Sequence, residues 1–278
     1  MLCGESRWLS PFWGEMNLSQ QEQVACLAAD AAQLLLESGG EIYRVQQTIE
    51  HIGKAYGISR IHAYVVTNAI FVSLEKSEGG SVNEMRYVRT RSVHLSRVIA
   101  VNALSRRIAG GGVSLEQAQQ ELQRVRTLPP SAFWLQVLAC GVGTACFAYL
   151  FGGTAWDAFA AFWVGLMLQP FVLLLARHGA DQFISNTLCA VLVATASVVA
   201  AQLLALAGIA CSLDKIIIGG IIPLVPGIAL TNAIRDVANS DYVSGTIRAV
   251  EALLIAASIA LGVGFVLKLC ALIPGVVL

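Results

Sequence analysis

The feature that most constrains this chain is an abrupt change in polarity near Pro130. Residues 1–128 contain 13 Lys/Arg and 12 Asp/Glu, whereas the longer stretch 129–278 contains only 5 and 6. A helix needs about 20 apolar residues to cross the hydrocarbon core of a bilayer. Because several apolar runs of that length follow Pro130, the sequence predicts a soluble head joined to a membrane-embedded helical bundle.

Composition supports a membrane protein and excludes several other classes. Charged residues make up 13% of the 278-residue chain and hydrophobic residues 56%, against about 25% charged in soluble domains. The formal net charge is zero and there is no basic tail, so nucleic acid is not an expected partner. The seven cysteines are scattered without a CxxC motif, and we expect neither a metal site nor a cofactor.

Three regions are predicted along the chain. Residues 1–17 read as a disordered leader without a signal-peptide core, and Met16 is an alternative start. Residues 18–128 form a small cytoplasmic α+β domain. Residues 129–278 form a membrane α-helical bundle of five transmembrane helices.

The head shows helical periodicity at both ends and strand periodicity in the middle. Ser19 and Glu22 form a capping-box pattern before the first helix. We expect helices over 19–38, 41–56, 95–108 and 114–125, interrupted by Gly39-Gly40, Gly57 and Gly110–Gly112, and strands over 61–74 and 82–90 joined by a turn at 78–80.

Polar residues in the head suggest one weak candidate site. Glu37, Glu41 and Arg44 flank the Gly-Gly turn and could meet there to bind a ligand, although charges at helix ends more often interact with backbone dipoles. His62 is interpreted as structural. The basic run of Arg86, Arg89 and Arg91 is interpreted as a solvated strand face in preference to a phosphate site. No catalytic residues are predicted, because no nucleophile elbow, P-loop or carboxylate pair is present.

Five spans are predicted, over 132–151, 155–176, 187–210, 216–234 and 251–269. Arg177, Arg235 and Arg248 lie in the connections on one side of the bundle, so the positive-inside rule places the head in the cytoplasm and the C-terminus outside. Five is an odd number, and many transporters pair two inverted repeats. Since the chain ends at Leu278 after the fifth span, we expect the second half to come from another polypeptide or from self-association.

The fourth span is interrupted by Pro223, Pro226 and Gly227. Irregular backbone at membrane depth persists only where it is buried in protein or lines a cavity. A broken helix there would offer carbonyl and amide groups to a solute, with a substrate pathway continuing along Thr231, Asn232 and Asp236. The alternative is that the prolines are packing kinks and Asp236 marks the helix end, and spacing alone does not separate the two.

Two further acids lie near predicted span ends. Glu251, at the start of the fifth span, is a candidate coupling group together with Asp236, or else an acid at a helix N-terminus. Asp157, at the start of the second span, has the same two interpretations, and the structural one is favoured.

Four segments together resemble the threonine/serine exporter family. They are Glu37–Arg44, Asn68–Leu74, Pro226–Asp236 and Ser244–Glu251. The resemblance implies a cytoplasmic head followed by five spans, with Pro226, Gly227, Asn232 and Asp236 in the functional segment. Full-length members are similar to this chain followed by a second five-span unit, and split members, including a succinate exporter, carry that unit as a separate small subunit.

The resulting hypothesis is a subunit of a secondary exporter in the plasma (inner) membrane, coupled to a proton or ion gradient, and not an enzyme. Its expected partners are the lipid bilayer, a small-molecule solute and a five-helix small subunit or further copies of itself. Threonine or serine is the preferred solute, and a dicarboxylate such as succinate is the alternative. A membrane-anchored enzyme or sensor ranks below both, because an anchor needs only one span.

Overall fold

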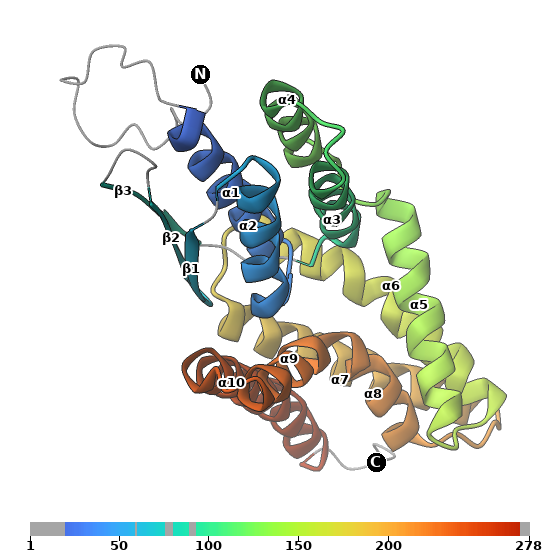
Figure 1. Ribbon diagram of the computed structural model, residues 1–278. Coiled ribbons are helices and arrows are strands. Elements are labelled where there is room, and N and C mark those ends of the chain that lie inside the picture. Colours follow the sequence, from blue (N-terminus) through green and yellow to red (C-terminus); the bar gives the residue numbers. More distant parts are fainter. Residues whose placement is uncertain (1–19, 59, 76–79, 89–92, 273–278) are drawn as a thin grey trace. The chain divides into compact units, whose positions relative to one another are not determined.

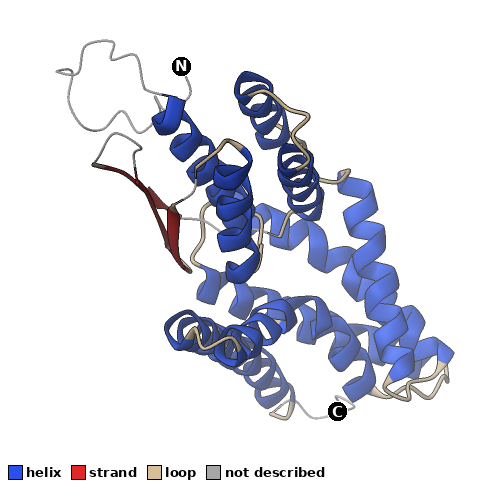
Figure 2. Ribbon diagram, viewed as in Figure 1, coloured by secondary structure: helices blue, strands red, loops and turns tan. Residues whose placement is uncertain are grey.

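The computed structural model describes residues 20–58, 60–75, 80–88 and 93–272, and helices dominate these residues beside one small sheet (Figure 2). Two compact units are present. The first comprises residues 1–130 and 235–245, and the second comprises 131–234 and 246–278. The predicted leader 1–17, the start at Met16 and the capping box at Ser19 lie outside the described residues.

The first unit combines four helices with three strands, labelled in Figure 1. They are α1 (Gln20–Glu37), α2 (Ile42–Ala55), β1 (Ile61–Val66), β2 (Ala69–Glu75), β3 (Ser81–Tyr87), α3 (Leu95–Ala109) and α4 (Leu115–Arg126). Gly39, Gly57 and Gly111 follow helix ends with positive φ, as the sequence predicts. Ser114 caps α4 through a reciprocal capping box with Gln117.

The stretch 61–74 forms two strands, because a tight turn at Thr67-Asn68 pairs Val66 with Ala69. The antiparallel sheet has the order β1-β2-β3. Ile70, Val72 and Leu74 of β2 are buried, as their alternation predicts, and belong to the core formed with α1 and α2. The proposed turn at 78–80 lies largely outside the described residues.

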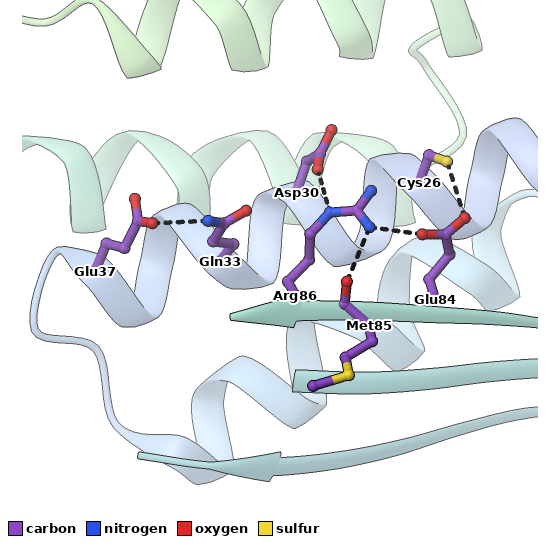
Figure 3. Close-up of polar contacts among 7 residues, drawn as sticks. All are labelled: Cys26, Asp30, Gln33, Glu37, Glu84, Met85 and Arg86. Carbon is purple, nitrogen blue, oxygen red and sulfur yellow. Dashed lines mark hydrogen bonds and ion pairs between the residues drawn. The ribbon is translucent and has the colours of Figure 1, made fainter. Parts of the chain in front are cut away.

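Arg86 corrects one prediction. It lies on β3 at the same parity as the buried Val82, so its side chain points toward α1 and not into solvent. Its Nε donates to Asp30 Oδ1 at 3.0 Å and its Nη1 to Glu84 Oε2 at 2.6 Å, with only 14% of the side chain exposed (Figure 3). The predicted solvated face is therefore wrong at Arg86, and Arg89 and Arg91 lie outside the described residues.

Burial and the two carboxylates act on Arg86 in opposite directions. Desolvation is the largest influence and would lower the pKa of the guanidinium, but Asp30 and Glu84 together raise it above its ordinary value. The group therefore stays charged and holds two acids of neighbouring elements together. Removing the cation would leave two carboxylates near one another with little access to water.

We predict that Arg86→Met lowers the stability of the first unit by about 2 kcal/mol, because it leaves Asp30 and Glu84 without their cation. The measurement is hydrogen exchange of α1 and β3 in the full chain. Arg60→Met is the matched control, since Arg60 forms an exposed pair with Glu75 and its loss should leave exchange unchanged. Equal effects of both substitutions would contradict the prediction.

The second unit is helical throughout its described residues. It contains α5 (Phe133–Leu150), α6 (Ala155–Arg177), α7 (Gln182–Leu206), α8 (Leu213–Ile221), the short 3₁₀ turn η1 (Ile222–Leu224), the first part of α9 (Gly227–Ala238) and most of α10 (Tyr242–Cys270). In the described part of the chain, α5, α6, α7 and α10 are long and apolar enough to cross a membrane, and counting the bent pair α8–η1 and α9 as one span gives five.

Two helices begin before the spans that the sequence predicts. The helix α7 begins at Gln182 because the side chain of Asp181 accepts a hydrogen bond from the backbone N–H of Phe183 at 2.8 Å. Similarly, Asp241 Oδ1 accepts from the backbone N–H of Ser244 at 3.2 Å, and α10 begins at Tyr242. Polar cap residues thus extend both helices beyond their apolar runs.

Small residues allow the helices of the second unit to pack closely. A Cβ on Gly165 would lie 2.3 Å from Thr144 Oγ1, and one on Gly219 would lie 2.7 Å from the carbonyl oxygen of Thr144. The Thr144 hydroxyl donates across to the carbonyl of Ala161 at 2.7 Å. In a lipid environment the hydrophobic effect does not drive helices together. Close packing of their backbones and hydrogen bonds between helices stabilise the association instead.

Asp157 supports the structural interpretation. Its carboxylate forms a capping box with Thr154 at the start of α6 and accepts from the backbone N–H of Ser212 at 2.8 Å, and the residue is fully buried. The acid therefore joins two helix ends of the second unit, which accounts for its burial without a role in transport.

Candidate functional site

The fourth apolar segment is broken at the predicted prolines. Pro223 lies in η1, Val225 is extended with φ −63° and ψ 129°, and α9 begins after Pro226. The two helical pieces differ in direction by 58°. An unbroken rod is excluded, and the predicted interruption is confirmed.

Backbone hydrogen bonding at the break is local and incomplete. Neither proline has an N–H, so the carbonyl of Gly219 loses its α-helical donor at position 223. The N–H of Val225 donates to the carbonyl of Ile222 at 3.1 Å, and that of Gly227 donates back to Val225 at 2.8 Å. These two short-range hydrogen bonds take the place of the regular helical ones between η1 and α9. The backbone therefore carries incompletely bonded polar groups within an apolar segment.

The polar residues after the break lie in different environments. Thr231 is exposed, and its hydroxyl donates to the carbonyls of Gly227 and Ile228 of its own helix. Asn232 and Asp236 are only 8% and 4% exposed. Their spacing of four residues places them on one face of α9, as predicted.

Glu251 is not at a helix N-terminus. It is the tenth residue of α10 and is half-buried, because the Asp241 cap moves the helix start nine residues upstream. Arg248 is also inside α10 and is 4% exposed, so it is a buried helical cation and not a loop charge. The alternative that treats Glu251 as a dipole-compensating terminal acid is therefore wrong.

The turn from α9 into α10 has the hydrogen bonds of a Schellman motif. The N–H of Ser240 donates to Val237, and that of Asp241 donates to Asp236 at 2.9 Å. Ser240 occupies the position where glycine is usual and has φ +66°, the only positive φ among the described non-glycine residues. This backbone conformation costs a residue with a side chain about 1 kcal/mol relative to glycine.

A cavity of about 360 Å³ lies within the first unit, between this turn and the head. Its walls come from α2, from Tyr64 of β1, and from Asp236 and the residues 239–243 that follow it. The sequence analysis did not anticipate it, because the two sides of the cavity are more than 170 residues apart in the chain. It brings Asp236, a predicted site residue, beside the head.

The three head candidates have different partners. Glu41 forms an ion pair with Arg235, at the end of α9. Glu37 Oε1 accepts from Gln33 Nε2 at 2.8 Å, and Arg44 is exposed while its backbone carbonyl accepts from the Thr48 hydroxyl. The structure thus connects Glu41 to the α9–α10 turn, and a joint site of Glu37, Glu41 and Arg44 stays a prediction.

No group of three or more His, Cys, Asp and Glu side chains suited to a metal ion occurs within the described ranges. The first unit instead contains a cavity lined by polar and aromatic residues, and the Glu41–Arg235 ion pair lies next in sequence to two of them, Ile42 and Asp236. The second unit offers a broken apolar segment followed by a buried amide.

Comparison with known proteins then identifies the family. The profile described as "Putative threonine/serine exporter" matches residues 26–270. The chain belongs to this family. The match includes the whole broken segment, the α9–α10 turn and the head from Cys26, within α1, onward, and the family is one of membrane transporters.

Curated relatives carry two kinds of name. The "Probable threonine/serine exporter" of Mycobacterium tuberculosis is 28% identical over 87% of this chain and 45% of its own length, and the "Threonine/serine exporter" of Corynebacterium glutamicum is 25% identical over 91% and 53%. The "Probable succinate transporter subunit YjjP" of Klebsiella aerogenes is 23% identical over 90% of this chain and 95% of its own length. The chain therefore spans about half the length of the two exporters. No solved structure matches.

We predict that reversing either charge of the Glu41–Arg235 pair loosens the α9–α10 turn. Glu41→Arg and Arg235→Glu should each increase hydrogen exchange across residues 235–245, and the double swap should restore protection. The expected effect is at most about 1 kcal/mol, because both side chains are partly exposed. The same swap at Arg107 and Glu121, another exposed pair, should leave this segment unchanged, whereas additive loosening in the double variant would contradict the prediction.

Proposed function

We propose that this chain is the head-bearing subunit of a secondary exporter for small polar metabolites, with threonine or serine as the preferred solute. The observation that carries the proposal is the proline-broken segment followed at once by buried Asn232 and Asp236, in a member of the exporter family. An amide and a carboxylate hidden on one helix face serve no purpose for an anchor.

Membrane physics supports a pathway at this segment. Irregular backbone survives at membrane depth only where protein or a polar cavity surrounds it. We therefore assign Pro223, Pro226, Gly227, Asn232 and Asp236 to the solute pathway. Thr231 remains a weaker member, because its own helix satisfies its hydroxyl.

The topology that we propose has five spans, with the head in the cytoplasm and the C-terminus outside. Arg177 is the last residue of α6, and Arg235 lies shortly before the α9–α10 turn, on the side that we assign to the cytoplasm. Lys215, near the start of α8, and Lys268, near the end of α10, are assigned to the opposite side. The assignment of residues 235–245 to the same compact unit as the head supports this sidedness. The finer domain division, 18–128 and 129–278, belongs to the same proposal.

We propose a second, separate five-helix subunit or a further copy of this chain as the partner. The support is that a relative of nearly equal length is named a transporter subunit, while the relatives named exporters are about twice as long. An odd number of spans also suits a partner of inverted topology.

Succinate is the alternative solute, because the subunit relative carries that name. The direct test is efflux from cells, or uptake into inverted vesicles, that contain this chain with a five-helix small subunit. Gradient-driven movement of labelled threonine is expected to exceed that of labelled succinate. Transport of neither solute, with both subunits present in the membrane, would refute the proposal.

We predict that Asp236→Asn and Glu251→Gln each reduce gradient-driven efflux at least about tenfold, because a neutral group cannot carry the coupling ion. The reduction corresponds to about 1.4 kcal/mol in the rate-limiting step. Asp214→Asn is the matched control, since Asp214 is exposed and paired with Lys215 at the start of α8, and it should transport normally. Unchanged efflux in both test variants would remove the coupling role of these acids.

A further inference from the structure

The cavity of the first unit has the size of a small-molecule site. Its volume is about 360 Å³, within the range of roughly 300 to 1,000 Å³ typical of ligand pockets. It is open to solvent on one side and lined by residues of α2, β1 and the α9–α10 turn. Neither the family match nor the names of the relatives assign a role to it.

The charge of its lining selects one kind of ligand. Asp236 and Asp241 contribute carboxylates, while no Lys, Arg or His is among the described residues that line it. Arg235, next in sequence to Asp236, is engaged with Glu41. A cationic group is therefore favoured inside, and a dicarboxylate would meet like charges.

Aromatic side chains strengthen this preference. Tyr43, Tyr64 and Tyr242 line the cavity from three different elements, and each is more than half exposed. None of them belongs to the hydrophobic core, although the Tyr64 ring also lies against Phe71, with ring centroids 6.3 Å apart. Tyrosine faces attract ammonium groups through the ring quadrupole.

The turn keeps polar side chains at the cavity despite their conformational cost. Asp241 uses Oδ1 to cap α10, and no partner among the described residues is bonded to its Oδ2. Ser240 retains a side chain at a left-handed position that glycine would occupy with less strain. The Ser240 hydroxyl and the Gln46 amide can donate to the hydroxyl or carboxylate of a ligand whose ammonium lies by Asp241 and the tyrosines.

We propose that this cavity is a binding site for a small solute bearing an ammonium group, and that it discriminates against dicarboxylates. This inference rests on the proposed export function for its choice of solute. In this proposal the head selects the solute at the α9–α10 turn, which follows Asp236.

The test is binding to the full chain in lipid nanodiscs, followed by ligand-observed NMR. L-Threonine and L-threonine amide, which both carry the ammonium, should bind, whereas N-acetyl-L-threonine and succinate should bind at least tenfold more weakly. Succinate binding as tight as that of L-threonine would overturn the proposal.

Variants place the binding in the cavity. Asp241→Asn and Tyr64→Leu should each weaken L-threonine about tenfold, as expected for loss of one charge-assisted or cation–π contact. Asparagine is as good a helix cap as aspartate, so α10 should remain intact. The matched controls are Asp181→Asn, another helix-capping acid, and Tyr87→Leu, an equally exposed tyrosine outside the cavity, and both should bind normally.

Ser240→Gly separates folding from recognition. It should raise the thermal midpoint of the chain and still weaken L-threonine binding, and unchanged binding in this and the other two cavity variants would overturn the proposal.

If this chain and its small subunit together export threonine while those variants bind it normally, the cavity proposal fails and the export function stands. If no export occurs but binding remains sensitive to Asp241→Asn, the cavity proposal stands and the export function fails.

Discussion

The break between α8 and α9 depends on backbone hydrogen bonding in an apolar segment. Two prolines three residues apart remove two donors, and the chain responds with one 3₁₀ turn, one extended residue and a 58° change in direction. A soluble protein could satisfy such a break with water. In a membrane segment it is stable only beside protein or a polar cavity, which is the basis for our proposal that the break and the buried Asn232 and Asp236 after it act together.

A cluster and a single ion pair in the first unit show that burial determines how much a charged side chain contributes to stability. Arg86 is nearly enclosed between Asp30 and Glu84, so it fastens β3 to α1 and behaves as part of the core. The Glu41–Arg235 pair is partly exposed and joins α2 to the end of α9. Surface pairs contribute little stability, so this pair adds much less to the stability of the first unit than the buried Arg86 cluster does.

The family match gives these features a common setting. The chain belongs to a family of membrane transporters, matched over residues 26–270. Small residues such as Gly165 and Gly219 bring the helices of the second unit close together. Meanwhile Ser197 and Gln202 on α7 carry buried polar atoms that no described residue satisfies by a hydrogen bond, as expected where a solute, water or a partner helix completes the environment.

Local patterns in the sequence were sufficient for most elements. Alternation placed Ile70, Val72 and Leu74 in the core, glycines marked the helix ends, and the prolines marked the broken segment, since each depends on neighbouring residues alone. The starts of α7 at Gln182 and of α10 at Tyr242 also have a local signal, because an aspartate cap precedes each helix and extends it beyond its apolar run.

Contacts between distant residues were decided by the tertiary structure. The sequence by itself determined that an apolar bundle follows a polar α+β head, and that Asn232 and Asp236 share one helix face. Only the fold paired Arg86 with Asp30, joined Glu41 to Arg235 and closed a cavity around Tyr64 and Asp241, because residues 56 to 194 positions apart leave no periodic trace of their contact.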